Sequence, residues 1–399
     1  MTELDDPRKS LPAVSAMLEA EAIQRLIEVH TRPLVLDAIR DVLDECRRLL
    51  KPGAPPLSST DVAGRVAALL DLRALDRTRP VVNATGILLH TGLGRAVLPS
   101  EAAAALGRLD RCCNLQIDLE TGLRGKRNHS VEQLLCKLTG AEAAVIVNNN
   151  AAATLLILTA LCAGKEVVVS RGQLIEIGGS FRLPDCIHQS GARLVEVGTT
   201  NKTHLRDYEN ALSENTGAVM RVNPSNYRVT GFTKEVPVAE LVSLKQRQPV
   251  IVIDDLGCGA LIPLEQFGLP HEPTAAESVA AGADIVCLSG DKLIGGPQAG
   301  IIVGKKDLVK RIRKHPLNRM LRVGKLTDVA LEHTLRLFLE PGTLVARHPT
   351  LRMLTMPLDA LKRRANRLKR RIEQTSPGLN ARVLEDVSEV GGARCPIRR

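Results

Sequence analysis

The chain contains no tryptophan, and aromatic residues make up only 2% of its 399 positions. Apolar residues together reach 44%, so a large core has to be built from leucine, valine, isoleucine and alanine, and the length suggests two or three domains. No apolar run attains the roughly 18 residues that cross a membrane, and the N-terminal "MTELDDPRKSLPAV" has no apolar signal core. We therefore expect a soluble, cytoplasmic protein without a membrane partner.

Paired cysteine motifs are also missing. The nine cysteines are scattered along the chain, and none has the C-x-x-C spacing, which argues against a zinc site or a redox pair. Most of them are expected to be small core residues in a reducing cytosol. We expect no metal site.

The formal net charge of +10 is distributed unevenly. Residues 1–80 carry a net charge of −1, whereas residues 305–399 carry +14, with the densest basic run at "KRRANRLKRR" (362–371). Such a run is either a solvated helix face or a surface that meets the phosphates of a nucleic acid or of an anionic substrate.

Two textures divide the chain. Residues 14–50 have apolar residues at three- and four-residue spacings, which predicts helices, and "KPGAPPLSST" (51–60) predicts a break. From about residue 80, short β-branched runs alternate with helical stretches, which is typical of a mostly parallel α/β sheet with helices on both faces. We expect a helical module with its linker (1–60), a large α/β domain (61–345) and a small C-terminal domain (346–399). The β-branched runs are "AAVIVNNN", "EVVVS", "ARLVEVG", "GAVMRVN", "PVIVIDD", "ADIVCLSG" and "AGIIVG".

The stretch "SGDKLIGGPQAG" (289–300) places a lysine just after one of these runs. Sites in open α/β sheets form at the C-terminal ends of strands, and Gly295 and Gly296 let the backbone turn close to whatever Lys292 holds. A lysine desolvated there becomes a good nucleophilic amine. Taken alone, the pattern also fits a loop lysine with no role.

Three upstream stretches fit one cofactor, pyridoxal 5'-phosphate, which needs a lysine for its aldehyde and a carboxylate for its ring nitrogen. "PVIVIDDLGCGA" ends a strand with Asp254 and Asp255; we favour Asp255 because it is the last residue before the turn. Asn226 is the candidate for a bond to the ring's phenolic oxygen. "VIVNNNAAATLL" predicts a helix N-terminus that seats the phosphate. The candidate phosphate ligands are Asn149, Asn150, Ala151 and Ser289.

Each of these features has a simpler explanation by itself, since an aspartate at a strand end is often a helix cap and an asparagine run is often a turn. Their shared order along the chain is phosphate seat, ring-oxygen contact, ring-nitrogen carboxylate and lysine. That order favours an α/β protein with the fold of the fold-type-I pyridoxal phosphate enzymes.

Long stretches of the chain resemble the L-seryl-tRNA(Sec) selenium transferase family, the selenocysteine synthases. The likeness covers roughly residues 80–350 and extends more weakly through the helical front section. It includes "VVNATGILLHTGLGRAVLP" (81–99), "DLETGLRGKRNHSVEQLLCKLTGAEAAVIVNNNAAA" (118–153) and "SGDKLIGGPQAGIIVGKK" (289–306). The resemblance implies a helical N-terminal domain that grips tRNA and a C-terminal small domain. Because "LEDVSEVGGARCPIRR" resembles only the start of that small domain, we expect it to be truncated.

What the resemblance implies is the conversion of L-seryl-tRNA(Sec) to L-selenocysteinyl-tRNA(Sec). Selenophosphate is the implied selenium donor, and a dehydroalanyl-tRNA held on the cofactor is the implied intermediate. The implied partners are seryl-tRNA(Sec), selenophosphate and further copies of the chain, as dimers assembled into a ring such as a decamer. No DNA partner is expected.

The resemblance also assigns arginines to the donor anion. Arg95 in "TGLGRA" and Arg319 and Arg322 in "NRMLR" are implied to bind it, and arginine suits an oxyanion through its bidentate fork. Because Arg319 and Arg322 are three positions apart, we expect them on one helix face, with a solvated surface as the alternative.

Two assignments are open at this stage. Asp291, beside the lysine, is implied to assist proton handling or is a structural cap. No aromatic residue is an obvious partner for the face of the cofactor ring, so Arg171 or Gln173, past the run "EVVVS", is the candidate.

Two other functions also fit the sequence. One is a pyridoxal phosphate lyase of the same superfamily acting on a small amino acid or amino sugar acid. The other is a catalytically reduced RNA-binding relative. The front section's net charge of −1 departs from the basic patch expected of a tRNA-binding domain, although Arg40, Arg47 and Arg48 are candidates for a local basic stripe.

Overall fold

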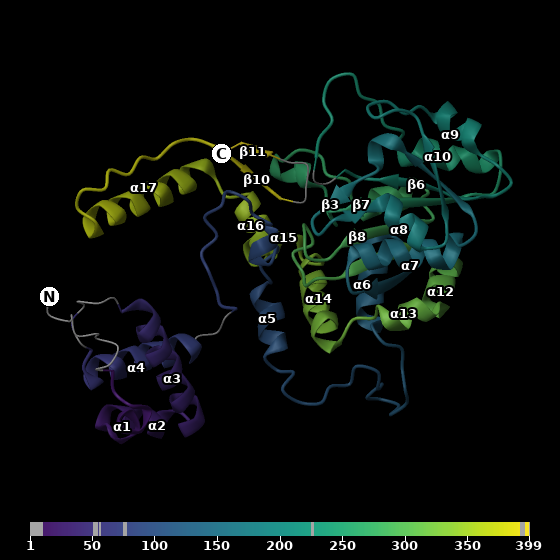
Figure 1. The fold of residues 1–399 in the computed structure, drawn as a ribbon. Helices are drawn as coiled ribbons and strands as arrows, with labels where there is room; N and C mark the ends of the chain where they lie inside the picture. The colour runs from purple at the N-terminus through teal and green to yellow at the C-terminus, as the bar shows by residue number, and fades with distance from the viewer. Residues whose placement is uncertain are drawn as a thin grey trace, which may run out of the picture. The chain divides into compact units, whose positions relative to one another are not determined.

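The computed structural model describes residues 11–50, 55, 57–74, 78–224, 227–391 and 396–398. The chain divides into two compact units, Met1–Val82 and Asn83–Arg399, whose elements are labelled in Figure 1. Among the described residues, no helix combines the length and apolar character needed to cross a membrane.

The first unit is helical, as the apolar spacing predicts. Its core is built by aliphatic side chains such as Ile39 and Leu43 from one long helix and Val62 and Val66 from the next. The unit extends beyond the boundary predicted at residue 60, because α4 packs against α3. Its helices are α1 (Val14–Glu19), α2 (Glu21–Val29), α3 (Arg32–Leu49) and α4 (Ser59–Ala74).

A seven-stranded sheet forms the centre of the second unit, with strand order β1-β9-β8-β7-β6-β2-β5. All seven β-branched runs identified in the sequence are strands, and the predicted mostly parallel sheet is confirmed; β9 is the strand that runs antiparallel to both of its neighbours. The strands are β1 (Ala143–Val147), β2 (Glu166–Ser170), β5 (Arg193–Val197), β6 (Thr216–Val222), β7 (Ile251–Gly257), β8 (Ile285–Ser289) and β9 (Gly300–Gly304).

Helices cover both faces of this sheet (Figure 1). Apolar side chains of α7, α8 and α12 share a core with one face, and those of α6, α10, α11 and α14 share a core with the other. The helices of this unit up to α14 are α5 (Ser100–Leu106), α6 (His129–Thr139), α7 (Asn150–Cys162), α8 (Leu183–Gln189), α9 (Leu205–Ala211), α10 (Val238–Ser243), α11 (Ala275–Ala280), α12 (Lys306–Lys314), α13 (Pro316–Met320) and α14 (Lys325–Leu337).

The C-terminal part continues with helices and a small hairpin. The end of β10 and the residue after it form backbone hydrogen bonds with residues 86–89. For example, the amide of Leu89 donates to the carbonyl oxygen of Val390 at 2.8 Å. The remaining elements are α15 (Pro341–Arg347), α16 (Pro349–Leu354), α17 (Leu358–Thr375), the paired strands β10 (Val387–Glu389) and β11 (Pro396–Arg398), and the paired strands β3 (Glu176–Ile177) and β4 (Phe181–Arg182).

Candidate active site

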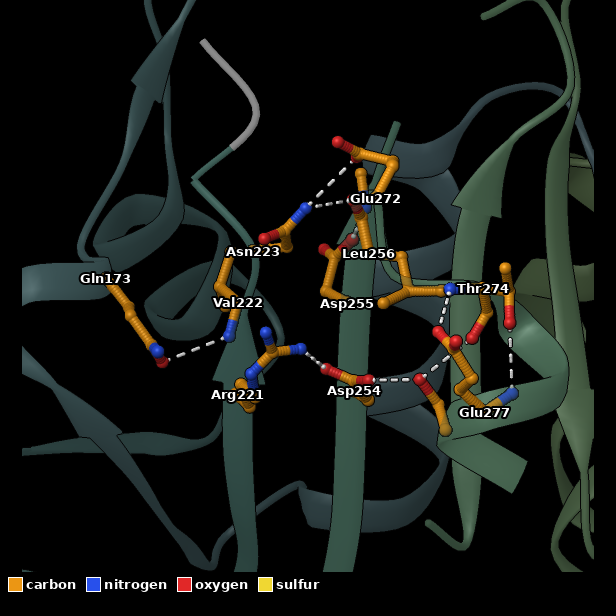
Figure 2. Close-up of polar contacts among 12 residues, drawn as sticks. Gln173, Arg221, Val222, Asn223, Asp254, Asp255, Leu256, Glu272, Thr274 and Glu277 are labelled. Carbon is orange, nitrogen blue, oxygen red and sulfur yellow. Dashed lines mark hydrogen bonds and ion pairs between the residues drawn. The ribbon is translucent and has the colours of Figure 1, made fainter. Parts of the chain in front are cut away.

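The two adjacent aspartates of β7 point to opposite faces of the sheet, because side chains alternate along a strand. Ile253, two residues before Asp255, packs in the core shared with α7, whereas Leu256, two residues after Asp254, packs in the other core. Asp254 accepts hydrogen bonds from Arg221 at 2.8 Å and from Ser278 at 2.6 Å (Figure 2). Asp254 is therefore satisfied by a buried ion pair on the face away from α7.

Strand β7 continues past Asp255 to Gly257, so the expectation that Asp255 is the last residue before the turn was wrong. Asp255 faces α7 and is buried. Its Oδ1 accepts from the side-chain amide of Asn150 at 2.7 Å and from the Gly257 amide at 2.9 Å, and its Oδ2 accepts from the hydroxyl of Thr154 at 2.9 Å. Burial raises the pKa of Asp255, while these hydrogen bonds and the positive charge of Lys292 oppose the rise. Asp255 is thus a desolvated carboxylic acid whose negative charge a cationic ring nitrogen would neutralise.

The N-terminus of α7 provides the expected anion seat. Asn149 caps the helix, with its side-chain oxygen accepting from the Ala152 amide at 2.9 Å. The amides of Asn150 and Ala151 belong to the first turn, where a helix offers no acceptor of its own, so they are open to an anion. This seat lies tightly on β9: a Cβ atom at Gly300 would come within 2.0 Å of the Asn149 carbonyl oxygen.

Lys292 lies in a tight turn after β8. The Gly295 amide donates to the Lys292 carbonyl at 3.0 Å, and Gly296 donates back to the carbonyl of Gly290 at 2.9 Å. Burial raises the pKa of the Cys258 thiol to about 12, and the positive charge of Lys292 opposes this rise. The charge of Lys292 therefore acts on two residues, Asp255 in β7 and Cys258 just after it.

Ser289 ends β8 and is buried. It pairs with Gly300 of β9, and Gly300 pairs on its other side with Val147, the last residue of β1. The ends of β8, β9 and β1 therefore meet below the first turn of α7, which supports Ser289 as a neighbour of the anion seat.

The side-chain oxygen of Asn150, whose amide bonds Asp255, is buried and has no hydrogen-bond partner among the described residues. The side-chain oxygen of Asn223, just after β6, is likewise buried and unpaired among them. Asn223 continues the β6–β7 ladder, since its amide donates to the carbonyl of Asp255 at 2.8 Å. The unpaired oxygen of Asn150, an open helix N-terminus and a desolvated carboxylate fit a polar cofactor that carries a phosphate and a protonated ring.

Arg95 and Asp291 come together although 196 positions separate them. The Nη1 atom of Arg95 donates to Oδ2 of Asp291 at 2.8 Å, and Arg95 has a left-handed backbone with φ of 60°. The pair lines a pocket of about 470 Å³ that also includes Thr91, Gly296 and Gln298. An arginine and a carboxylate thus face one cavity beside the lysine turn.

Arg319 and Arg322 do not share a helix face, so that prediction was wrong. Helix α13 ends at Met320, and Arg322 pairs with Val147 at the end of β1. The amide of Asn148 donates to the carbonyl oxygen of Leu321 at 2.9 Å. Both arginines nevertheless line one pocket of about 490 Å³. Within one chain this pocket is separate from the one that Arg95 lines.

Arg171 turns toward the sheet edge. Its guanidinium donates to the carbonyl of Gly198 and lies 3.3 Å from Glu196 of the edge strand β5. No described contact brings it to Asp255 or Lys292. The alternative, Gln173, is buried and accepts from the Val222 amide at 3.1 Å (Figure 2), whereas the predicted ring-oxygen ligand, Asn226, lies outside the described residues.

Sequence reasoning missed Thr154, which bonds Asp255, and two buried polar residues beside the end of β7. Thr154 lies four positions after Asn150, and this spacing on a predicted helix was the available signal. Asn223 and Glu272 are both buried, and the Asn223 amide lies 3.4 Å from Glu272 (Figure 2). Glu272 follows β7 by a long loop, so no local pattern pointed to it.

Comparison with known families identifies two matching segments. The family model described as L-seryl-tRNA selenium transferase matches residues 81–399, and the one described as selenocysteine synthase N terminal matches residues 8–47.

Named relatives match over nearly the whole chain. The L-seryl-tRNA(Sec) selenium transferase of Geobacter sulfurreducens is 48% identical over 395 residues, covering 97% of this chain and 85% of that protein. Its counterpart from Clostridium botulinum (strain Okra) is 44% identical over 393 residues, covering 98% of this chain and 85% of that protein.

Among solved structures, D-glucosaminate-6-phosphate ammonia-lyase is similar with a TM-score of 0.52 and 23% identity, covering 68% of this chain and 72% of that one. This likeness concerns the fold, and it agrees with the predicted fold-type-I architecture.

Proposed function

The chain belongs to the L-seryl-tRNA selenium transferase family, and we propose that it converts L-seryl-tRNA(Sec) to L-selenocysteinyl-tRNA(Sec). It is a transferase, and its cofactor is pyridoxal 5'-phosphate. When bound, this cofactor stabilises negative charge at the α-carbon of the seryl group, so that the α-proton and the β-hydroxyl can leave before selenium adds to the β-carbon.

One observation carries the proposal: the open N-terminus of α7, the buried carboxylate of Asp255 and the turn of Lys292 converge at the C-terminal ends of neighbouring strands. We assign Asn149, Asn150, Ala151 and Ser289 to the phosphate, Asp255 to the ring nitrogen and Lys292 to the aldehyde. The opposite orientation of Asp254, in its pair with Arg221, supports the choice of Asp255.

Proton handling is assigned to Lys292 and Asp291. Arg95 orients the Asp291 carboxylate through its 2.8 Å bond, and both side chains line the same pocket next to the turn. Asn226 remains the proposed contact of the phenolic oxygen, and Arg171 remains a weaker proposal for the ring face because its guanidinium is engaged at β5.

Selenophosphate is the proposed selenium donor, bound by Arg95, Arg319 and Arg322. Among the described residues neither Arg319 nor Arg322 has a carboxylate partner, and Arg124 and Lys126 line the same pocket as these two. Such a surplus of cations suits an oligo-anion. Competition between selenophosphate and a sulfur analogue measures which of the two donors the site prefers.

We propose that copies of the chain assemble as dimers in a ring such as a decamer. Within one chain, the pocket that Arg95 lines is separate from the pocket that Arg319 and Arg322 line. The large apolar side chains of Leu119, Leu123 and Met320 are each more than two-thirds exposed. Covering them with a second copy is favourable. Sedimentation that gives a monomer at micromolar concentration would contradict the assembly.

Seryl-tRNA(Sec) is the proposed macromolecular partner, with no DNA partner and a cytoplasmic location. We assign the helical unit, Met1–Val82, to tRNA binding, residues 83–345 to catalysis and residues 346–399 to the small domain. The candidate stripe is partly neutralised, since Arg47 pairs with Asp44 at 2.5 Å and Arg40 lies 3.9 Å from Asp37. We therefore add the basic run of α17, which has no buried side chain, as a second contact for the RNA backbone.

Filter binding of the tRNA to the chain without residues 1–82 tests the front unit; undiminished affinity rules out its role. The function itself is tested by selenium transfer from selenophosphate to seryl-tRNA(Sec) with purified protein. Lys292→Ala should abolish transfer while leaving tRNA binding intact. Turnover of a free amino acid or amino sugar acid without tRNA turnover would instead indicate the lyase.

A further inference from the structure

His348 lies between α15 and α16 and is fully buried. Its Nδ1 accepts a hydrogen bond from the Leu351 amide at 3.2 Å, and its Nε2 lies 2.9 Å from the carbonyl oxygen of Ile294. An amide can only donate and a carbonyl can only accept, so Nδ1 is unprotonated and Nε2 carries the hydrogen. Burial also lowers the pKa of His348, which favours this neutral ring.

The acceptor of this hydrogen bond belongs to the turn that carries Lys292. Ile294 lies inside that turn, which the bond from the Gly295 amide to the Lys292 carbonyl closes at 3.0 Å. Gly295 has φ of 70°, and a Cβ atom there would come within 2.3 Å of Cε1 of the His348 ring. The imidazole therefore fills the space that a side chain at position 295 would need.

The ring is also fixed from a third side. Phe338, at the C-terminal end of α14, meets it edge-on with a centroid distance of 5.4 Å and an interplanar angle of 78°. With both nitrogens bonded and one edge packed, the ring has a single orientation in which Nε2 points at the lysine turn.

We infer that His348 is a positioning residue for Lys292: its Nε2–H group holds the turn 292–296 in the conformation from which the lysine amine addresses the cofactor. The inference rests on the proposed function, in which Lys292 binds the cofactor aldehyde. Capping of α16 requires only the Nδ1 atom of His348, whereas the hydrogen bond from Nε2 reaches Ile294 in the turn that carries Lys292.

Two conservative variants separate the two nitrogens. In His348→Asn the side-chain oxygen can replace Nδ1 as the helix cap but cannot reach Ile294. In His348→Gln the amide can reach the Nε2 position and donate to Ile294. Both are compared with the full-length wild-type chain, with and without pyridoxal 5'-phosphate.

Hydrogen exchange of the cofactor-free protein is the first readout. His348→Asn should unfold near the wild-type temperature but exchange the amides of residues 290–299 about tenfold faster, the effect of one buried hydrogen bond. His348→Gln should exchange like wild type. The second readout is release of bound cofactor, followed by the visible absorbance of the lysine-linked form, which should be about tenfold faster in His348→Asn only.

The reverse pattern, with His348→Gln impaired and His348→Asn unchanged, shows a cap alone and overturns the inference. If His348→Asn does not fold, Gly295→Ala disturbs the same contact from the other side. It should show the same fast exchange and release, and unchanged values overturn the inference. A wild-type protein without the visible band disproves the proposed function instead, while the exchange measurement still tests His348.

Discussion

Replacing Asp255 by asparagine should separate cofactor binding from folding. The carboxylate is buried and forms no ion pair with a side chain among the described residues, and burial raises its pKa. Because the folded-state pKa lies above the unfolded value, the stability contributed by the protonated acid is fully present below the unfolded pKa of about 4 and is lost as pH rises through the folded pKa. At pH 7 the charge therefore penalises the cofactor-free fold.

Asparagine removes that charge and keeps the shape. Its oxygen can still accept from Asn150 and Gly257, and its amide can donate to the hydroxyl of Thr154, which in turn can donate to the Asn150 carbonyl at 3.1 Å. Asp255→Asn should thus change the free energy of unfolding of the cofactor-free protein by less than about 1 kcal/mol, or raise it. Any advantage over wild type should disappear as pH falls and the wild-type acid is protonated.

Cofactor binding should respond in the opposite direction. A hydrogen bond between charged groups contributes about 1.5–3 kcal/mol, and 1.4 kcal/mol corresponds to tenfold in affinity. Losing the contact to the protonated ring nitrogen should therefore weaken pyridoxal phosphate by about 10- to 150-fold, measured by titration of the visible absorbance.

Asp254→Asn is the matched control one position away. It breaks a buried pair with Arg221, whose side chain is 13% exposed, on the other face of the sheet, and this should cost about 3–5 kcal/mol of stability. The folded fraction should bind the cofactor as wild type does. Urea unfolding at pH 7 and pH 5 measures the stabilities. Equal destabilisation by the two variants, or wild-type affinity in Asp255→Asn, refutes the assignment.

Three further changes probe the site and its support. Gly300→Ala forces a Cβ atom to within 2.0 Å of the Asn149 carbonyl, so it should cost about 1–3 kcal/mol in thermal unfolding and weaken the cofactor; a wild-type titration would count against the seat. Thr154→Val removes a bond to Asp255 and should raise the pKa of that acid further, moving the acid limb of cofactor binding to higher pH in a pH series of titrations. Burial raises the pKa of Asp284, but hydrogen bonds from Lys245 and Lys305 outweigh it and lower the pKa below its usual value. Asp284→Asn should therefore reduce the free energy of unfolding by on the order of 2 kcal/mol at pH 7. Because a lowered pKa stabilises above the unfolded pKa, that gap should close below about pH 4 in urea unfolding, and a gap independent of pH would exclude the charge as its cause.

Local patterns were sufficient to predict the strands, and they indicated the order in which the candidate site residues occur along the chain. Each β-branched run became a strand because alternating, branched side chains suit a buried sheet. Lys292 and Asp255 each follow or end such a run, so their place at the C-terminal edge was foreseeable. The asparagine run at the start of α7 likewise predicted a helix N-terminus, and Asn149 is its cap.

Contacts between distant segments were not foreseeable. Arg319 and Arg322 were expected on one helix, but pairing with the end of β1 ends α13 at Met320. Arg171 or Gln173 was the candidate for the ring face. The pairing of β2 with β5 places the Arg171 guanidinium beside Glu196, a contact that the sequence did not indicate.

Periodicity along the chain determined that the front section is helical and which runs are strands. It could not determine which of Asp254 and Asp255 faces α7, because that depends on how the strands are ordered and on which helix crosses which face. The bonds from Asn150 to Asp255 and from Arg95 to Asp291 join positions 105 and 196 residues apart. Such pairs are selected by the packing of the whole sheet, and no local propensity records them.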